Sequence, residues 1–404
     1  MKKLAVNTIG RWPVLLFSCL FLLAQYACKK DNDGAAPVIT HVRNYAASPD
    51  DSLVQAVIPG QWIVLVGRNL ENAVAVTFNG VSASIKSQMF SDTSAVVQVP
   101  AVIPFPSVPA DKLNVIQFIT TNGTANFTFN IVAPPPAITS ISNENAQEGD
   151  SVFVYGTNFF FVEKLSFAGV QVDKFKATDD GTSIGFIQPH IPGPGNVIVA
   201  TKSGADTTVY NVQDLATGML CDFDQVNTFS WGANIENNSA DFPGNHGAYA
   251  VLKNDVLPGG EGSWWGSQRS INTNDVQWLP VERLSDPVED YAVKFEINAP
   301  NDWNGTSLYV VRNYDMALLA RYEPWLQTDG TAKAYSTKGW RTVTIPFTEF
   351  RTNSGKGTSP ASLTELLGST AHSPINIQTA NFAATPTPTG FYAAIDNIRV
   401  VKIK

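Results

Sequence analysis

The feature that most constrains the fold of this 404-residue chain is an internal repeat. The segment PGQWIVLVGRNL at residues 59–70 returns as EGDSVFVYGTNF at 148–159, and VTFNGV at 76–81 returns as LSFAGV at 165–170. Six residues recur without a gap at a constant spacing of 89: Gly60 and Gly149, Gly67 and Gly156, Asn69 and Asn158, Phe78 and Phe167, Gly80 and Gly169, Pro100 and Pro189. Such a match indicates two copies of one domain.

Each copy has the pattern of a small β-sandwich. Short runs rich in β-branched and aromatic residues end at glycine, and Asn79-Gly80 suits the tight turn of a β-hairpin. Only 15 % of all residues are charged, whereas Gly and Pro number 29 and 25, which favours short strands over amphipathic helices. We therefore expect an all-β protein, in which the proline-rich residues 132–137 form a stiff connector between the copies.

Both copies resemble the IPT/TIG immunoglobulin-like domain. The resemblance rests on a Pro-x-Ile start at Pro37 and Pro136, a glycine-ended strand with its G-x-N turn, and an F-x-G hairpin, in the same order in each copy. It implies tandem IPT/TIG domains at residues 37–133 and 134–213. Domains of this family mostly serve as spacers or interaction modules.

Residues 1–28 have the pattern of a lipoprotein signal peptide. Basic residues precede an apolar run of 11 residues at 14–24, which is too short for an ordinary membrane span. Ala27-Cys28 resembles a bacterial lipoprotein cleavage site, in which the cysteine is lipidated, and a polar tether follows at 29–36. We expect a lipid anchor in the outer membrane of a Gram-negative cell, with the protein facing outward. An ordinary secretory peptide is the alternative.

The region from 214 to 404 differs in composition. Seven of the nine tryptophans lie after residue 220, among alternating runs typical of strands, such as YAVKFEIN at 291–298. A domain of this length with roughly eight to ten strands fits a jelly-roll-like β-sandwich. Cys221 is the one cysteine left after the leader and the lipidated position, so we expect a small buried hydrophobe there and no intramolecular disulfide.

The tryptophans divide by their context. Three are expected in the core: Trp231, Trp278 and Trp340. By contrast, Trp264, Trp265 and Trp303 lie among Gly, Asn, Ser and Asp, which mark turns, so at least one of them should be exposed. Trp325 could lie in a site or cap the core.

Exposed indoles on a rigid sandwich suit saccharides. A pyranose ring has an apolar face of C–H groups, on which an aromatic ring can lie flat. Polar side chains in the neighbouring turns can then bond the sugar hydroxyls. The candidates for this role are Asn301, Asp302, Asn304, Arg312, Tyr314 and Arg269.

The whole layout resembles the surface glycan-binding proteins of Gram-negative polysaccharide-utilisation loci, and residues 218–404 resemble their xyloglucan-binding type of domain. The matching segments are Phe223-Asp224, Trp264-Trp265, 293–298, 321–325, 339–350 and 393–401. The resemblance implies non-catalytic capture of xyloglucan or another β-glucan or hemicellulose, with contact through Trp264-Trp265 and around Trp303. It also implies a TonB-dependent transporter and a companion glycan-binding lipoprotein as partners.

Two other functions remain open from the residues. A surface adhesin or scaffold would bind protein partners through the IPT/TIG faces. A glycoside hydrolase would need a pair of carboxylates flanking the scissile bond. No spacing singles out such a pair among the acidic residues of the last domain, which include Asp286, Glu289, Asp290, Glu296 and Glu323.

The net charge and the candidate metal ligands in the sequence give little further information about function. The formal net charge is −8 and the basic residues form no stripe, which argues against nucleic-acid binding. We expect no cofactor, and the four histidines form no visible metal set. The sequence offers one candidate metal site. It is a structural Ca²⁺ between Asp222 or Asp224 and Asp396, where the first and last strands of the domain meet.

Overall fold

The computed structural model describes residues 34–404 except 245–246, 258–264 and 381–386. The expected signal peptide and Cys28 therefore lie outside the described residues. The regular secondary structure of the described chain is mostly β-strand, as expected, and the chain divides into two compact units, with the boundary between Ala133 and Pro134. In this part of the chain no helix has both the length and the apolar character needed to cross a membrane.

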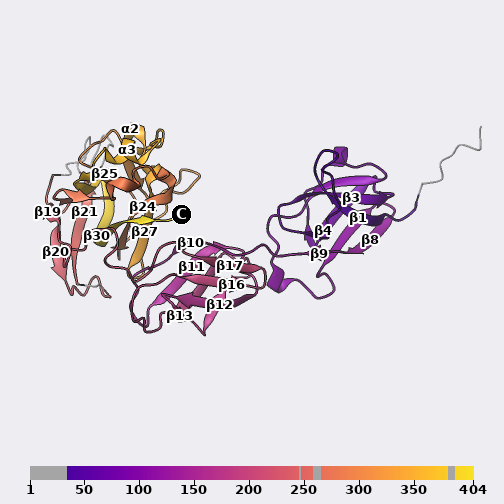
Figure 1. The fold of residues 1–404 in the computed structure, drawn as a ribbon, viewed down its shortest axis with the longest axis horizontal. Helices are drawn as coiled ribbons and strands as arrows, with labels where there is room; N and C mark the ends of the chain where they lie inside the picture. Colours follow the sequence, from indigo (N-terminus) through magenta and orange to yellow (C-terminus); the bar gives the residue numbers. More distant parts are fainter. Residues whose placement is uncertain (1–33, 245–246, 258–264, 381–386) are drawn as a thin grey trace, which may run out of the picture. The chain divides into compact units, whose positions relative to one another are not determined.

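The first unit is a small β-sandwich (Figure 1). One sheet has the order β1-β3-β6, the other β5-β4-β7-β8, and β2 pairs in parallel with β9. Buried and partly exposed residues alternate along β3, with Ile63 and Leu65 in the core. The strands are β1 Val38–Asn44, β2 Ala56–Val57, β3 Trp62–Arg68, β4 Ala73–Phe78, β5 Val81–Ser82, β6 Ser94–Gln98, β7 Val115–Thr120, β8 Gly123–Thr128 and β9 Asn130–Ile131.

The second unit begins with a sandwich of the same design. Its two four-stranded sheets have the orders β10-β11-β15-β14 and β13-β12-β16-β17. The strands are β10 Ala137–Ile141, β11 Ser151–Thr157, β12 Val162–Phe167, β13 Val170–Gln171, β14 Phe175–Ala177, β15 Ser183–Ile187, β16 Ile198–Thr201 and β17 Gly204–Thr207. Residues of both sheets, including Val152, Val154, Leu165 and Phe167, form one buried cluster.

The repeated residues occupy equivalent places in the two sandwiches. Gly67 pairs with Ile39 and Gly156 with Ile138, and each pairing is followed by a shift in register. A Cβ at either glycine would lie within 1.8 or 2.1 Å of a carbonyl oxygen of the neighbouring strand, so no other residue fits. The close approach of two backbones therefore explains why this glycine recurs.

The second unit continues into a larger β-sandwich. Its six-stranded sheet has the order β20-β21-β30-β24-β27, with β18 also paired to β30, and its five-stranded sheet has the order β19-β22-β29-β25-β26. The strands are β18 Met219–Cys221, β19 Phe229–Trp231, β20 Asn234–Asn237, β21 Ala248–Leu257, β22 Ser270–Thr273, β23 Val276–Gln277, β24 Tyr291–Asn298, β25 Ser307–Arg312, β26 Leu319–Tyr322, β27 Arg341–Pro346, β28 His372–Ser373, β29 Ile375–Ala380 and β30 Thr387–Lys402. The helices are α2 Thr352–Gly355 and α3 Leu363–Leu367.

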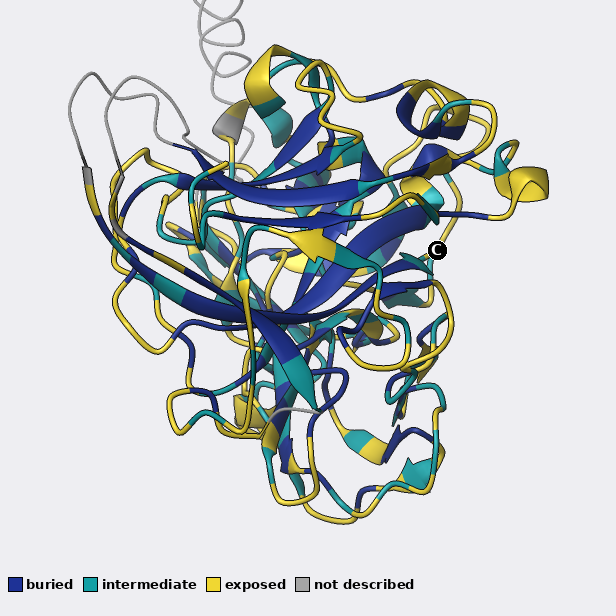
Figure 2. Ribbon diagram, turned by 90° about the vertical axis from the view of Figure 1, so that its left-hand side faces the viewer, coloured by how far each residue is buried: buried dark blue, intermediate teal, exposed yellow. Residues whose placement is uncertain are grey.

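One buried cluster fills the larger sandwich. It combines residues of both sheets, such as Phe295 and Ile395 from one and Val310 from the other, with the apolar side of α3. Cys221 is fully buried in this cluster, as expected. Strands of both sheets are coloured as buried in Figure 2.

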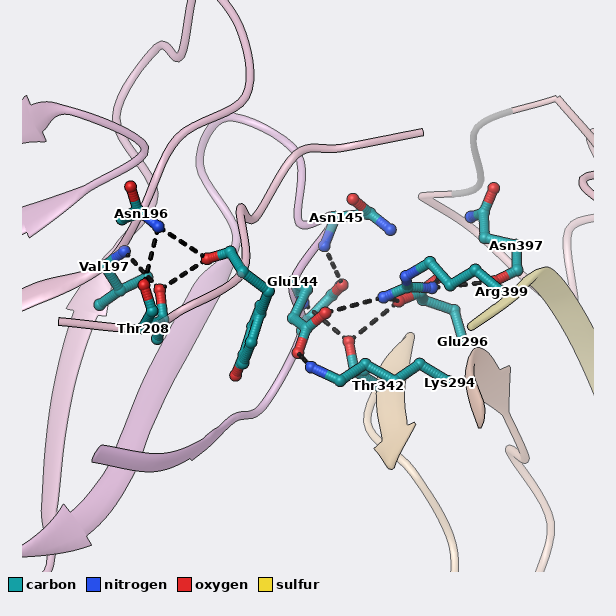
Figure 3. Close-up of polar contacts among 12 residues, drawn as sticks. Glu144, Asn145, Asn196, Val197, Thr208, Lys294, Glu296, Thr342, Asn397 and Arg399 are labelled. Atoms are coloured by element: carbon teal, nitrogen blue, oxygen red, sulfur yellow. Dashed lines mark hydrogen bonds and ion pairs between the residues drawn. The ribbon is translucent and has the colours of Figure 1, made fainter. Parts of the chain in front are cut away.

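Strand β24 is buried on both of its faces. Val293, Phe295 and Ile297 point into the core cluster, while the alternate residues Lys294 and Glu296 meet the preceding sandwich. There Glu144 accepts a hydrogen bond from Lys294 at 2.5 Å, as Figure 3 shows. The alternating sequence of this strand would ordinarily indicate a solvated face. In this chain the second face carries an ionic contact between sandwiches.

Arg399 of β30 completes this buried ionic cluster. Its guanidinium group donates to Glu144 and Glu296, at 2.9 Å in both cases. Burial lowers the pKa of Lys294, against the opposing effect of Glu144. Burial acts in the same direction on Arg399, but Glu296 and Glu144 outweigh it and hold the pKa of Arg399 above its ordinary value. Two cations and two carboxylates thus compensate one another away from water.

Candidate functional site

The candidate site lies on the outer side of the five-stranded sheet. Along β25, Leu308 and Val310 belong to the central core, whereas Tyr309 and Val311 form part of a separate buried cluster on the other side. The same alternation puts polar residues on the outer side of two neighbouring strands, Ser270 and Asn272 in β22 and Asn376 and Gln378 in β29. These polar residues are buried, so other segments of the chain cover them.

Three aromatic side chains are exposed on or beside this sheet. Trp231 at the end of β19 and Tyr314 in the loop after β25 each keep 38 % of their surface exposed. Trp265, in the segment that leads to β22, keeps 61 % exposed. The expectation that at least one tryptophan of the turn-rich segments is exposed is therefore confirmed. Large exposed aromatic groups mark recognition surfaces.

Trp231 corrects a prediction, because the sequence placed it in the core. Phe229 and Trp231 are two residues apart in β19 and would share a face in a regular strand. The pairing of β19 with β22 shifts register between them, so that Phe229 packs against the core while Trp231 reaches the surface. Ser230 and Gly232 flank Trp231, and the same small-residue context that marked Trp265 could have identified it.

Two buried asparagines connect the segments that carry Trp231 and Tyr314. Asn272 donates through Nδ2 to the carbonyl oxygen of Trp231 at 3.2 Å. Asn376 donates through Nδ2 to Oδ1 of Asn272 at 3.1 Å, and its own Oδ1 accepts from the backbone N–H of Tyr314 at 2.8 Å. The two amide groups therefore form a chain of hydrogen bonds across β22 and β29.

The segment after Trp265 is fastened to the same sheet. The backbone N–H of Gln268 donates to the carbonyl oxygen of Gly232 at 2.8 Å. The carbonyl oxygen of Arg269 accepts from the backbone N–H and the hydroxyl of Thr379 in β29, at 3.0 and 3.1 Å. The chain next to Trp265 is thus tied both to the end of β19 and to β29.

Arg321 and Glu323, at the β26 edge of this sheet, are paired with each other. Arg321 of β26 donates through Nε to Glu323 at 3.1 Å and through Nη2 to Ser307 at 2.9 Å, and Ser307 in turn donates to Glu323. The guanidinium group also lies 5.5 Å from the centre of the Tyr309 ring. Glu323, one of the acidic residues considered for catalysis, is therefore engaged in an ion pair.

The aspartates considered for calcium have other partners. Asp222 accepts from the backbone N–H groups of Asp224 and Val226, Asp224 accepts from that of Ala248, and Asp396 accepts from that of Asn397. Across the residues that the structure describes, no group of three or more His, Cys, Asp or Glu side chains is arranged to hold a metal ion. The structure gives no support for a Ca²⁺ site there.

Trp303 corrects a second prediction. Its side chain is fully buried, with the indole N–H donating to the carbonyl oxygen of Gly305 at 2.7 Å. The ring packs on Phe391 with centroids 4.7 Å apart, and on Tyr322 and Tyr335. A ring enclosed in this way offers no flat surface to a sugar, so the expected stacking role of Trp303 is wrong.

The other expected site residues are scattered. Asn301, Asp302 and Asn304 are exposed in the turn around Trp303. The guanidinium group of Arg312 lies against Gly368, the residue that ends α3, and away from the outer side of the sheet. Trp325 is half-buried and donates to the carbonyl oxygen of Thr306 at 2.8 Å. Trp264 lies outside the described residues.

Arg269 and Tyr314 are the expected polar partners that the structure places beside exposed tryptophans or the asparagine chain. Trp278 and Trp340 are buried, at 1 % and 7 % exposure, so their expected place in the core is confirmed. Nothing in the sequence marks Asn272 or Asn376, because an isolated asparagine in a strand has no local pattern that distinguishes it from a turn residue.

Comparisons with known proteins find similar sequences. Residues 212–402 match the family described as the surface glycan-binding protein B xyloglucan binding domain. An IPT/TIG domain-containing protein of Bacteroides ovatus is 30 % identical over 161 residues, which are 40 % of this chain and 32 % of that protein. The match thus spans about a third of the relative's length.

The fold has a counterpart among solved structures. The surface glycan-binding protein PbSGBP-B from Prevotella bryantii has a similar crystal structure, with a TM-score of 0.62 and 21 % identity. The similarity covers 92 % of this chain and 99 % of that one. It confirms the expected fold class of immunoglobulin-like sandwiches in tandem followed by a larger β-sandwich.

Proposed function

We propose that this chain, whose residues 212–402 belong to the xyloglucan-binding domain family of surface glycan-binding protein B, captures a plant-type polysaccharide at the cell surface without cleaving it. The ligand is xyloglucan or another β-glucan or hemicellulose. The observation that carries the proposal is the exposure of Trp231, Trp265 and Tyr314 around one sheet of the domain that matches this family.

The exposed rings supply the physical basis of binding. An aromatic ring lying flat on the C–H face of a pyranose removes apolar surface from water on both partners. Because β-strands and their hydrogen-bonded loops already hold Trp231 and Tyr314, little conformational freedom is lost when the sugar binds. Rings spaced around one sheet can contact successive residues of an extended glycan chain.

The pairing of Glu323 on this sheet favours capture over cleavage. Glycoside hydrolysis ordinarily uses two carboxyl groups, about 5 to 9.5 Å apart, that flank the scissile bond. On this sheet Glu323 is engaged by Arg321 and Ser307, which leaves it poorly placed to act as nucleophile or proton donor.

The remaining parts of the chain give this domain its location. We propose that Cys28 carries the lipid anchor and that the IPT/TIG domains at 37–133 and 134–213 hold the domain at 214–404 away from the outer membrane. A TonB-dependent transporter and a companion glycan-binding lipoprotein would then receive the captured chain. The sequence pattern of residues 1–36 and the surface location in the family's description support this arrangement.

Affinity gel electrophoresis tests the function. The protein without its leader is run in native gels that contain xyloglucan, mixed-linkage β-glucan, xylan or no polysaccharide, beside Trp265→Ala and Trp62→Ala. Trp62 is 40 % exposed in the first sandwich and is a matched control for the loss of a surface indole. We expect retardation of the wild type and Trp62→Ala, reduced retardation of Trp265→Ala, and no release of reducing ends. Equal mobility of all proteins in every gel would overturn the proposal.

A further inference from the structure

We propose that Asn272 and Asn376 are positioning residues, which hold Trp231 and Tyr314 at a fixed separation and thereby set affinity for an extended β-linked glycan chain. This inference rests on the proposed function. It assigns a role in binding to two side chains that are fully buried.

The geometry of the two side chains is the first argument. Asn272 and Asn376 lie on adjacent strands, opposite each other in the pairing of β22 with β29. Asn272 donates through Nδ2 to the carbonyl oxygen of Trp231 in the neighbouring strand β19 and to Oγ of Ser270, and it accepts from Asn376. Asn376 accepts in turn from the backbone N–H of Tyr314 in the loop after β25. The result is an unbroken path from the carbonyl oxygen of Trp231 to the N–H of Tyr314. Both ends of the path are chain segments that present exposed rings.

The burial of polar groups is the second argument. An amide group taken out of water is costly unless its hydrogen bonds are satisfied, and an apolar side chain of similar size would pack without that cost. Further along the outer side of this sheet apolar residues do occupy such places, as with Val311 and Leu319. The asparagines lie where the exposed segments supply backbone groups that need polar partners.

The backbone of the Tyr314 loop is the third argument. Asn313 and Tyr314 have φ values of 50° and 56°, in the left-handed region that is sterically unfavourable for a residue with a Cβ atom. Strained backbone of this kind persists where the surroundings hold it, and it is found at binding sites. Oδ1 of Asn376 accepts a hydrogen bond from the backbone N–H of Tyr314 itself. Without that bond the loop can relax to negative φ and carry the Tyr314 ring to another place.

The test compares single substitutions in the protein without its leader. Asn272→Leu and Asn376→Leu remove the polar ends while keeping the branching and the number of non-hydrogen atoms. Asn298→Leu is the control, because Asn298 is equally buried but lies in β24 of the other sheet. Binding to xyloglucan and to mixed-linkage β-glucan is measured by titration calorimetry at a temperature where all variants are folded. We expect at least fivefold weaker binding for the two positioning variants and wild-type affinity for Asn298→Leu at a comparable loss of Tm.

Two outcomes separate this inference from the proposed function. If Trp231→Ala and Trp265→Ala weaken binding but Asn272→Leu and Asn376→Leu bind as the wild type does, the positioning role is overturned and the function stands. If the tryptophan variants also bind as the wild type does, the proposed site itself fails.

Amide hydrogen exchange of the unsubstituted protein tests the same role even if the variants do not fold. The bond to Asn376 implies that the Tyr314 amide, although it lies in an exposed loop, exchanges its hydrogen at least about a hundredfold more slowly than in an unstructured chain. Exchange at the unstructured rate would overturn the positioning role without any variant.

Discussion

Glu144 and Arg399 are 255 residues apart in the chain, yet their side chains form a buried hydrogen-bonded ion pair of 2.9 Å. Lys294 binds the same carboxylate, so Glu144 faces two cations across the contact between the smaller sandwich and the larger one. This shared ion cluster explains how the two sandwiches form one compact unit.

Replacement of Glu144 should destabilise this unit strongly. In Glu144→Gln two buried cations face Glu296 alone, and leaving a buried charge uncompensated costs about 3–5 kcal/mol. Urea denaturation followed by tryptophan fluorescence measures the change in the free energy of unfolding. Glu148→Gln is the matched control, because Glu148 is 66 % exposed and pairs with His190 at the surface. A shift for Glu144→Gln as small as that for the control, about 0.5 kcal/mol or less, would contradict the account.

The buried carboxyl group of Asp396 should make stability depend on pH. Burial, with Glu296, Asp224 and Asp222 nearby, raises the pKa of Asp396 to about 8 despite the opposing hydrogen bond from Asn397. In the unfolded chain the pKa is about 3.9. Between these values the folded protein keeps a proton that the unfolded chain has released. The contribution of this group to stability is therefore complete below about pH 4 and is lost as the pH rises through 8.

Asp396→Asn should remove this loss. We expect the free energy of unfolding of the wild type to fall between pH 5 and pH 8 relative to that of the variant, by at least about 1.4 kcal/mol, which corresponds to one unit of pKa. Urea denaturation at the two pH values measures the difference. Asp302→Asn, in an exposed turn, should run parallel to the wild type. Parallel curves for Asp396→Asn as well would show that Asp396 titrates normally.

Trp303 and Trp265 should respond to truncation in opposite ways. Trp303→Ala removes a fully buried indole from a ring cluster, which ordinarily costs about 3–5 kcal/mol. Trp265→Ala removes an indole that is 61 % exposed, and we expect a change below about 1 kcal/mol. Thermal unfolding of the two variants measures both effects. A Trp303→Ala protein as stable as Trp265→Ala would contradict the burial of Trp303.

The repeat could be recognised from sequence because backbone geometry imposes particular residues. Gly67 and Gly156 lie where any Cβ would collide with a carbonyl oxygen of the next strand. Asn69 and Asn158 have φ values of 59° and 61° and donate to the carbonyl oxygens of Ala36 and Pro135. Such local requirements leave the same residues at the same spacing in both copies.

The site was harder to predict, because side-chain direction depends on register. Asparagines around Trp303 correctly mark a turn, but the turn carries the indole into the core. A single shift in register between Phe229 and Trp231 turns the second of them outward. Neither the burial of Trp303 nor the register shift before Trp231 changes the local amino-acid composition, so neither could be predicted from composition.

Contacts between distant segments could not be predicted from the sequence. The residues 291–298 alternate as a strand with one solvated face would. In the structure Lys294 and Glu296 lie on that face. Lys294 donates a hydrogen bond to Glu144, which is 150 residues away in the chain. Only the assembled sandwiches bring these charges together.

The most direct test of the account is the affinity of a Trp231→Ala/Trp265→Ala double variant for xyloglucan oligosaccharides, measured by titration calorimetry with Tm recorded in parallel. If the exposed indoles hold the glycan, the double variant binds at least tenfold more weakly than the wild type, a loss of about 1.4 kcal/mol or more, at an unchanged Tm. A folded double variant that binds as tightly as the wild type would show that the exposed indoles do not hold the glycan.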